Sequence, residues 1–145
     1  MQYESASVKA LLADDDATSL LVATTALEIL GCAVVTVTNG RDAFERFRQE
    51  PFDVVFLDHR MPGLPGPTVA RLMRWHEVAE GRRPTPLVAL TACAMPEEID
   101  VFVTSGVNAV LLKPLMLDKL RTLIESLTPA HSRGQHRASV FRGPL

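Results

Sequence analysis

The sequence predicts an α/β fold, a doubly wound parallel sheet of five strands with helices on both faces. Three observations indicate this fold. Short apolar runs alternate five times with segments of helical periodicity, which is typical of parallel strands joined by right-handed helical crossovers. The strand-like runs are apolar at successive positions, as expected of strands buried on both faces. The length of 145 residues suits one domain with a core of ordinary size.

The first two strand–helix units come from the N-terminal third of the chain. VKALLA and AVVTVT, at 8–13 and 33–38, are the apolar runs that predict strands. Segments of helical periodicity follow them at about 17–30 and 40–49. Gly31 stands just after the first of these helices, where a glycine commonly ends a helix.

Three further units complete the pattern. The predicted strands are VVFL, PLVALT and AVLL, and the predicted helices lie at about 67–80, 96–105 and 116–127. Pro96, followed by Glu97 and Glu98, suits the first turn of the fourth helix, because proline has a favourable backbone angle there and acids complement the helix dipole. Gly106 follows the end of that helix.

Composition excludes several classes of protein. No run approaches the roughly 18 uninterrupted apolar residues of a membrane span, and MQYESASVK lacks the layout of a signal peptide. We therefore expect a cytoplasmic protein without membrane insertion. Cys32 and Cys93 lie in apolar contexts without metal-ligand spacing, which predicts packed, reduced thiols instead of disulfides or a zinc site.

Charge is distributed unevenly along the chain. The formal net charge is −2, but residues 129–145 contain three arginines and no acid, so the body before them is more acidic than the whole. An acidic body argues against nucleic-acid contact by that part of the chain. Residues 129–145 have little periodicity and few large apolar side chains, so we expect a disordered tail or linker there. Residues 1–6 are expected to form an N-terminal extension.

Charged and polar residues follow the predicted strands, where an open parallel sheet binds its ligands. These residues are Asp14, Asp15 and Asp16 after the first strand, Asp58 after the third, Thr91 at the end of the fourth and Lys113 after the fifth. Singly, each has an ordinary explanation: an aspartate as a turn former or helix cap, a threonine as a strand residue, a lysine as a solvated charge. Their joint placement indicates a site.

The chemistry of this set predicts a metal and a phosphoryl group. Two carboxylates about 4 Å apart repel by about 4 kcal/mol at an effective dielectric near 20, so a counter-ion is needed. An all-oxygen set without histidine or cysteine suits Mg²⁺. Asp58 is then placed to accept a phosphoryl group as a nucleophile. Gly63 and Gly66 would let the following backbone turn tightly around this edge.

Four ordered motifs resemble the receiver domain of two-component response regulators and hybrid sensor kinases. They are LLADDDATS, FDVVFLDHRMPGLPG, VALTACAM and GVNAVLLKPL, and the similarity covers about residues 7–127. The resemblance implies a receiver domain at 7–128 with a flavodoxin-like (βα)5 fold and the strand order 2-1-3-4-5. It also implies a phosphorelay switch that catalyses only its own phosphorylation and dephosphorylation, so not an enzyme in the usual sense.

The resemblance assigns a role to each residue of the site. Asp14 and Asp15 are the acidic pair that binds Mg²⁺ together with Asp58 and the main-chain carbonyl of Arg60. Asp58 is the phosphoacceptor, and Thr91 and Lys113 are the hydroxyl and the ammonium that contact its phosphoryl group. The Lys113–Pro114 peptide is expected to be cis, as is typical of the family.

The setting implied by the resemblance is a phosphorelay. The partner is expected to be a histidine kinase or a histidine-containing phosphotransfer domain, docking near the first helix and the loops around Asp58. The long polar connection before PLVALT and the segment ALTACAMPEE resemble receivers of hybrid kinases more than those of transcription factors, so the receiver of a hybrid kinase is the favoured context. Self-association is expected to be a weak homodimer at most.

Two positions depart from the family pattern. Val110 stands where the family commonly has a tyrosine or phenylalanine, three residues before the lysine. Coupling from Thr91 to the output surface, formed by the fourth helix, fifth strand and fifth helix, is therefore expected to be weaker. Arg60, two residues after Asp58, places a long cation beside the path of the phosphate.

Three alternatives remain open from sequence. A receiver-like module without phosphorylation would keep the fold but act only by protein interaction. A phosphatase of the haloacid dehalogenase type also uses an aspartate nucleophile with Mg²⁺, but it needs a second aspartate where this chain has Arg60, and the chain has no room for a cap domain. A flavodoxin would need phosphate-binding donors at the first turn, where this chain has acids.

Overall fold

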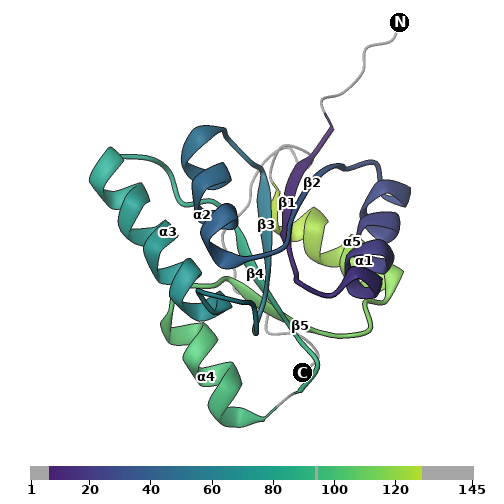
Figure 1. Ribbon diagram of the computed structural model, residues 1–145. Helices are drawn as coiled ribbons and strands as arrows, with labels where there is room; N and C mark the ends of the chain where they lie inside the picture. Colours follow the sequence, from purple (N-terminus) through teal and green to yellow (C-terminus); the bar gives the residue numbers. More distant parts are fainter. Residues whose placement is uncertain (1–6, 94, 129–145) are drawn as a thin grey trace, which may run out of the picture.

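Five strands alternate with five helices in the computed structural model, which describes residues 7–93 and 95–128 (Figure 1). In chain order the elements are β1 (Lys9–Ala13), α1 (Ala17–Ile29), β2 (Ala33–Val37), α2 (Gly40–Gln49), β3 (Val54–Asp58), α3 (Gly66–Glu80), β4 (Leu87–Thr91), α4 (Pro96–Thr104), β5 (Ala109–Leu112) and α5 (Leu117–Leu127). The N-terminal extension expected at 1–6 and the tail or linker expected at 129–145 lie outside the described residues.

The sheet is parallel, and its strands run in the order β2-β1-β3-β4-β5. This confirms the predicted doubly wound fold and its strand order. β3 and β4 are buried at every position, because they lie inside the sheet and are covered on both faces. The apolar runs of β3 and β4 therefore mark the centre of the molecule, whereas the edge strand β2 is buried only at Val37.

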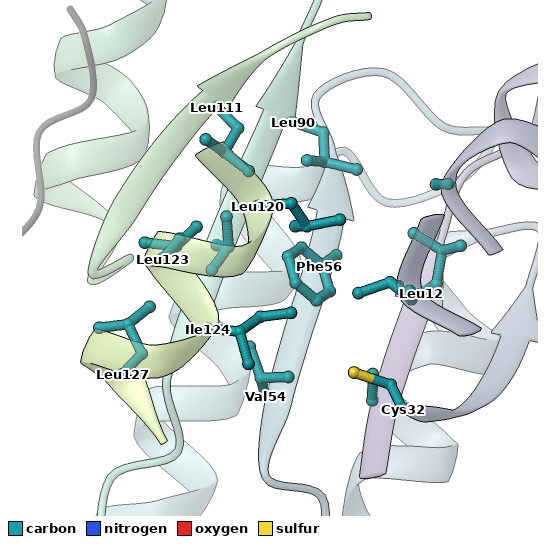
Figure 2. Close-up of a cluster of buried hydrophobic side chains, with 14 of the residues drawn as sticks. Leu12, Cys32, Val54, Phe56, Leu90, Leu111, Leu120, Leu123, Ile124 and Leu127 are labelled. Carbon is teal, nitrogen blue, oxygen red and sulfur yellow. The ribbon is translucent and has the colours of Figure 1, made fainter. Parts of the chain in front are cut away.

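Two hydrophobic layers cover the two faces of the sheet. On one face α1 and α5 pack over the strands, and Figure 2 shows Leu120 and Ile124 of α5 beside Phe56 and Val54 of β3. On the other face α2, α3 and α4 contribute side chains to the second cluster, which includes Phe102 of α4. Right-handed crossovers explain this division, because the direction of strand addition reverses after β2 and the following helices α2, α3 and α4 therefore lie on the face opposite α1.

The predicted helix boundaries agree with the structure to within one residue. Gly31 has a φ of 89° and follows the end of α1, and Gly106 has a φ of 106° and follows α4. Both angles lie in the left-handed region, which glycine adopts without strain. α3 begins at Gly66, one residue earlier than predicted, with Pro67 in its first turn.

The cysteine prediction is correct at one position and wrong at the other. Cys32 is free and buried under α1, whereas Cys93 is free and exposed in the loop after β4. β4 ends at Thr91, so the chain has already left the sheet at Cys93. Among the described residues, no helix has the length and apolar character needed to cross a membrane.

Candidate functional site

The register of the parallel strands brings the predicted site residues to one edge of the sheet. Ala13 pairs with Leu57, so Asp14 and Asp58 leave neighbouring strands at nearly the same level. Thr91 pairs with Leu112, so Lys113 begins just beyond the end of β4. Parallel strands present their carboxyl ends at one edge, which is where α/β sheets bind ligands.

Lys113 joins two carboxylates at the centre of this edge. Its Nζ lies 2.7 Å from Oδ2 of Asp14 and 2.8 Å from Oδ1 of Asp58. Asp14 is 1% exposed and Asp58 is 8% exposed, so both charges are largely removed from water and depend on the ammonium for compensation. The peptide between Lys113 and Pro114 is cis, as predicted.

A third carboxylate completes an acidic cluster. Asp14, Asp15 and Asp58 offer oxygen atoms that all lie within 4.8 Å of one another, and Asp15 is exposed to solvent. Hard carboxylate oxygens with an open, solvated side suit Mg²⁺, which binds one or two carboxylates and retains several waters. Lys113 contributes a single positive charge against three carboxylates. Both the oxygen ligands and the remaining negative charge therefore fit a divalent cation.

Burial and charge act together on Asp58 and Lys113. Burial raises the pKa of Asp58 above its ordinary value, the charges of Asp14 and Asp15 act in the same direction, and Lys113 opposes them. Burial also disfavours the charged form of Lys113, but its hydrogen bonds to Asp14 and Asp58 outweigh this effect, so the pKa of Lys113 is raised. The lysine therefore stays protonated beside a carboxylate that is costly to ionise.

Asp16 and Thr91 have local hydrogen-bond partners. Asp16 accepts a hydrogen bond from the backbone N–H of Ser19 at 2.8 Å and caps α1, which confirms its interpretation as a helix cap and lowers its pKa. The buried Thr91 hydroxyl donates to the carbonyl of Cys93 at 2.9 Å and accepts from its N–H at 3.1 Å. It therefore sits at the edge of the sheet but bonds to its own loop.

The response regulator receiver domain model matches residues 10–125. The chain belongs to this family. A receiver is a signalling module and not a classical enzyme, so membership removes the phosphatase and flavodoxin alternatives. Family membership also explains why the acidic cluster, the threonine and the lysine lie together at this edge of the sheet.

Relatives include both large sensors and small regulators. Sensor protein GacS of Pseudomonas syringae pv. syringae is 34% identical over 147 residues, covering 97% of this chain and 16% of GacS. The rice two-component response regulator ORR41 is 31% identical over 121 residues, covering 81% of this chain and 91% of its own length. The chain thus spans about a sixth of GacS but nearly all of ORR41.

A solved receiver supports the fold and the metal site. The receiver domain of sensor histidine kinase PA1611 from Pseudomonas aeruginosa PAO1 superposes with a TM-score of 0.77 at 27% identity, covering 85% of this chain and 98% of that domain. Its crystal structure holds a magnesium ion coordinated in the active-site cleft.

The two departures from the family pattern have definite places in this receiver. Val110 is half-buried against the cluster that contains Phe102, opposite Ala89 of β4. Arg60 extends from the β3–α3 loop, with 81% of its side chain exposed, and its Nη2 lies 3.7 Å from Oε2 of Glu98 in α4. The metal role of the Arg60 carbonyl stays a prediction.

Sequence reasoning missed the contributions of Ser19 and His59 to the site. Ser19 of α1 lies 3.4 Å from Lys113 Nζ through its hydroxyl, and it lines a hollow of about 310 Å³ between α1 and the Lys113–Pro114 turn. The ring of His59 packs against Phe102, with centroids 5.2 Å apart. Both contacts join segments far apart in sequence, and no local pattern predicts which side chains will meet.

Proposed function

We propose that this receiver accepts a phosphoryl group on Asp58 from a phosphohistidine. An oxygen of the Asp58 carboxylate attacks phosphorus, the P–N bond breaks, and the histidine nitrogen leaves with the bonding electron pair. The observation that carries the proposal is the position of Asp58 at the end of a fully buried strand, in contact with Lys113 and in an acidic cluster suited to Mg²⁺.

Each neighbour of Asp58 has a task in this reaction. Asp14, Asp15 and Asp58, with the carbonyl of Arg60, would hold Mg²⁺, which when bound would neutralise charge on the phosphoryl oxygens. Lys113 can move from the Asp58 carboxylate to a phosphoryl oxygen, because its ammonium already lies 2.8 Å from Oδ1. Thr91 supplies a hydroxyl to another phosphoryl oxygen once it leaves the carbonyl of Cys93.

The donor is a histidine kinase or histidine phosphotransfer domain that docks over α1. The apolar hollow beside Lys113 is bordered by Val22, which is 46% exposed, and Leu21 on the same helix is 68% exposed. Exposed apolar side chains next to a reactive site favour docking of a partner surface. The similarity to GacS favours the setting of a hybrid kinase. The proposal also includes a cytoplasmic location, residues 7–128 as the receiver unit and weak self-association at most.

Phosphorylation at Asp58 is testable by intact mass. With a small phosphodonor and Mg²⁺, the protein should gain one phosphoryl group, and Asp58→Asn should abolish the gain. Asp14→Asn and Asp15→Asn should weaken the Mg²⁺ dependence. The matched control is Asp16→Asn, since asparagine keeps the helix cap and the residue stands outside the acidic cluster.

The same experiment separates this function from the remaining alternative. Full labelling of Asp16→Asn together with none of Asp58→Asn is the expected result. If the Asn variant at position 58 labels like the wild type, the acceptor is wrongly assigned. If no donor labels the wild type, the chain is a receiver-like interaction module.

A further inference from the structure

We propose that α4 senses the state of Asp58 through His59 and Arg60, the two residues that follow it. The proposal rests on phosphorylation of Asp58 and adds the route by which the signal leaves the site. Val110 has no aromatic ring to carry a change from Thr91 to the output surface. The two residues after Asp58 each contact α4 directly, one by an aromatic contact and one by an ion pair.

Both contacts fall on one face of α4. His59 packs its ring on Phe102 with an interplanar angle of 69°, and Arg60 pairs with Glu98. Glu98 and Phe102 are four residues apart, so their side chains are neighbours on the helix surface. Phe102 is fully buried. One stripe of α4 therefore packs against the loop that follows the phosphoacceptor.

The backbone of His59 ties this contact to the central strands. Its N–H donates to the carbonyl of Leu90 at 3.0 Å, and its carbonyl accepts from the N–H of Gly66 at 3.0 Å. Because both main-chain groups of His59 are hydrogen-bonded, its ring moves together with the loop between β3 and α3. A displacement of that loop therefore shifts the ring that contacts Phe102, and Val110 is not involved.

Arg60 adds an electrostatic switch to this packing contact. Its pair with Glu98 is long at 3.7 Å and the guanidinium is exposed, so it is weakly held. A phosphoryl group on Asp58, two residues away, carries up to about two negative charges and offers the guanidinium a stronger partner. When Arg60 turns to that group, Glu98 loses its partner and the first turn of α4 is released.

Hydrogen exchange of the full chain tests this route. Peptides covering 96–104 are compared with and without phosphorylation, with labelling verified by intact mass. In the wild type, we expect α4 to exchange about fivefold faster when Asp58 is phosphorylated, as for a modest loss of local stability. In the double variant His59→Ala, Arg60→Gln, which keeps the acceptor, the change should nearly vanish.

Single variants separate release from general damage. Arg60→Gln and Glu98→Gln should both raise the exchange of α4 before phosphorylation and reduce the further change after it. Glu97→Gln is the matched control, since it removes a neighbouring exposed acid in the same turn and should behave as the wild type. Strand peptides should exchange alike in all unphosphorylated variants.

The outcomes distinguish this route from the function itself. A labelled double variant whose α4 still responds like the wild type would overturn the route while leaving the phosphoacceptor intact. A labelled wild type whose α4 does not respond would overturn it as well. Absence of labelling in the wild type would overturn the proposed function and the route together.

Discussion

Asp58 is the residue at which stability and function conflict. It is a nearly buried carboxylate beside Asp14 and Asp15, with Lys113 as its cationic contact. Burial and the neighbouring acids raise the pKa of Asp58, which means that the folded state resists its ionisation. By linkage, a folded-state pKa above the unfolded value lowers stability as pH rises through that interval, and the loss is complete above the folded pKa.

Replacing Asp58 should therefore stabilise the protein at neutral pH without Mg²⁺. Asp58→Asn removes the buried charge, and we expect the melting temperature to rise by about 2–5 °C, equivalent to roughly 1 kcal/mol for a domain of this size. The advantage of the variant should shrink as pH falls toward the unfolded pKa of an aspartate, because the wild-type carboxyl then becomes neutral.

Mg²⁺ should reverse this order. Binding to the folded state stabilises the wild type by mass action, whereas Asp58→Asn lacks one carboxylate of the cluster and should gain less. Thermal scans of both proteins, with and without Mg²⁺ and at two pH values, check the prediction. A variant that melts below the wild type in metal-free buffer at neutral pH would contradict it.

At the scale of the elements, the β3–α3 loop depends on the absence of a side chain at Gly66. A Cβ there would meet the carbonyl oxygen of Asp58 at a clashing distance and the ring of Phe102 at 3.1 Å. Gly63 in the same loop has a φ of 81° and open space around it. The sequence interpretation of both glycines as turn formers holds for Gly63, while Gly66 serves the close approach of α3 to β3.

Gly66→Ala should therefore damage the site more than the fold. Overpacking against backbone costs about 1–3 kcal/mol, and relief of the clash shifts Asp58, so the phosphorylation rate should fall at least tenfold. The control is Gly81→Ala at the end of α3, which has a φ of 66° and open space. It should lose similar stability but label at the wild-type rate. Equal labelling rates in the two variants would contradict the prediction.

The sequence predicts elements well here because each signal is local. Local structure follows directly from the apolar runs, from Gly31 and Gly106, and from the acids in the first turn of α4. The order of these strands and helices along the chain then predicts a fold of parallel units. The site was predictable for a related reason: strand ends of a parallel sheet meet at one edge, whatever the helices do.

Contacts between helices and loops were not predictable in this way. The packing of His59 on Phe102 and the pair of Arg60 with Glu98 depend on how α4 lies against the β3–α3 loop. The exposure of Cys93 depends on where the chain leaves β4. No local pattern encodes these distances, because they result from the packing of elements distant in sequence.

At the scale of the whole molecule, Arg74 joins α3 to two loops at the edge of the sheet opposite the site. Its guanidinium donates to the carbonyls of Gly106 and Thr85 at 2.9 Å, to Oδ1 of Asn108 at 2.8 Å, and to Oε1 of Glu77 at 2.8 Å. Glu77 is 3% exposed and also accepts from the N–H of Thr85 at 2.7 Å. The network holds the amino ends of β4 and β5, and so the register that pairs Thr91 with Leu112 and places Lys113 just beyond it.

Arg74→Met should be the most destabilising of these changes, since it leaves the buried Glu77 carboxylate without a cation. Breaking a buried pair by removing one partner costs about 3–5 kcal/mol, and we expect a corresponding loss in the free energy of unfolding measured with urea. Arg74→Met combined with Glu77→Leu should recover part of this loss, because the unpaired charge is removed.

The control is Arg71→Met, which replaces an exposed arginine on the same helix and should change stability by less than about 0.5 kcal/mol. Equal losses at positions 71 and 74 would show that the network contributes no more than surface charge does, and a double variant no more stable than Arg74→Met would show that the unpaired carboxylate is not the cause.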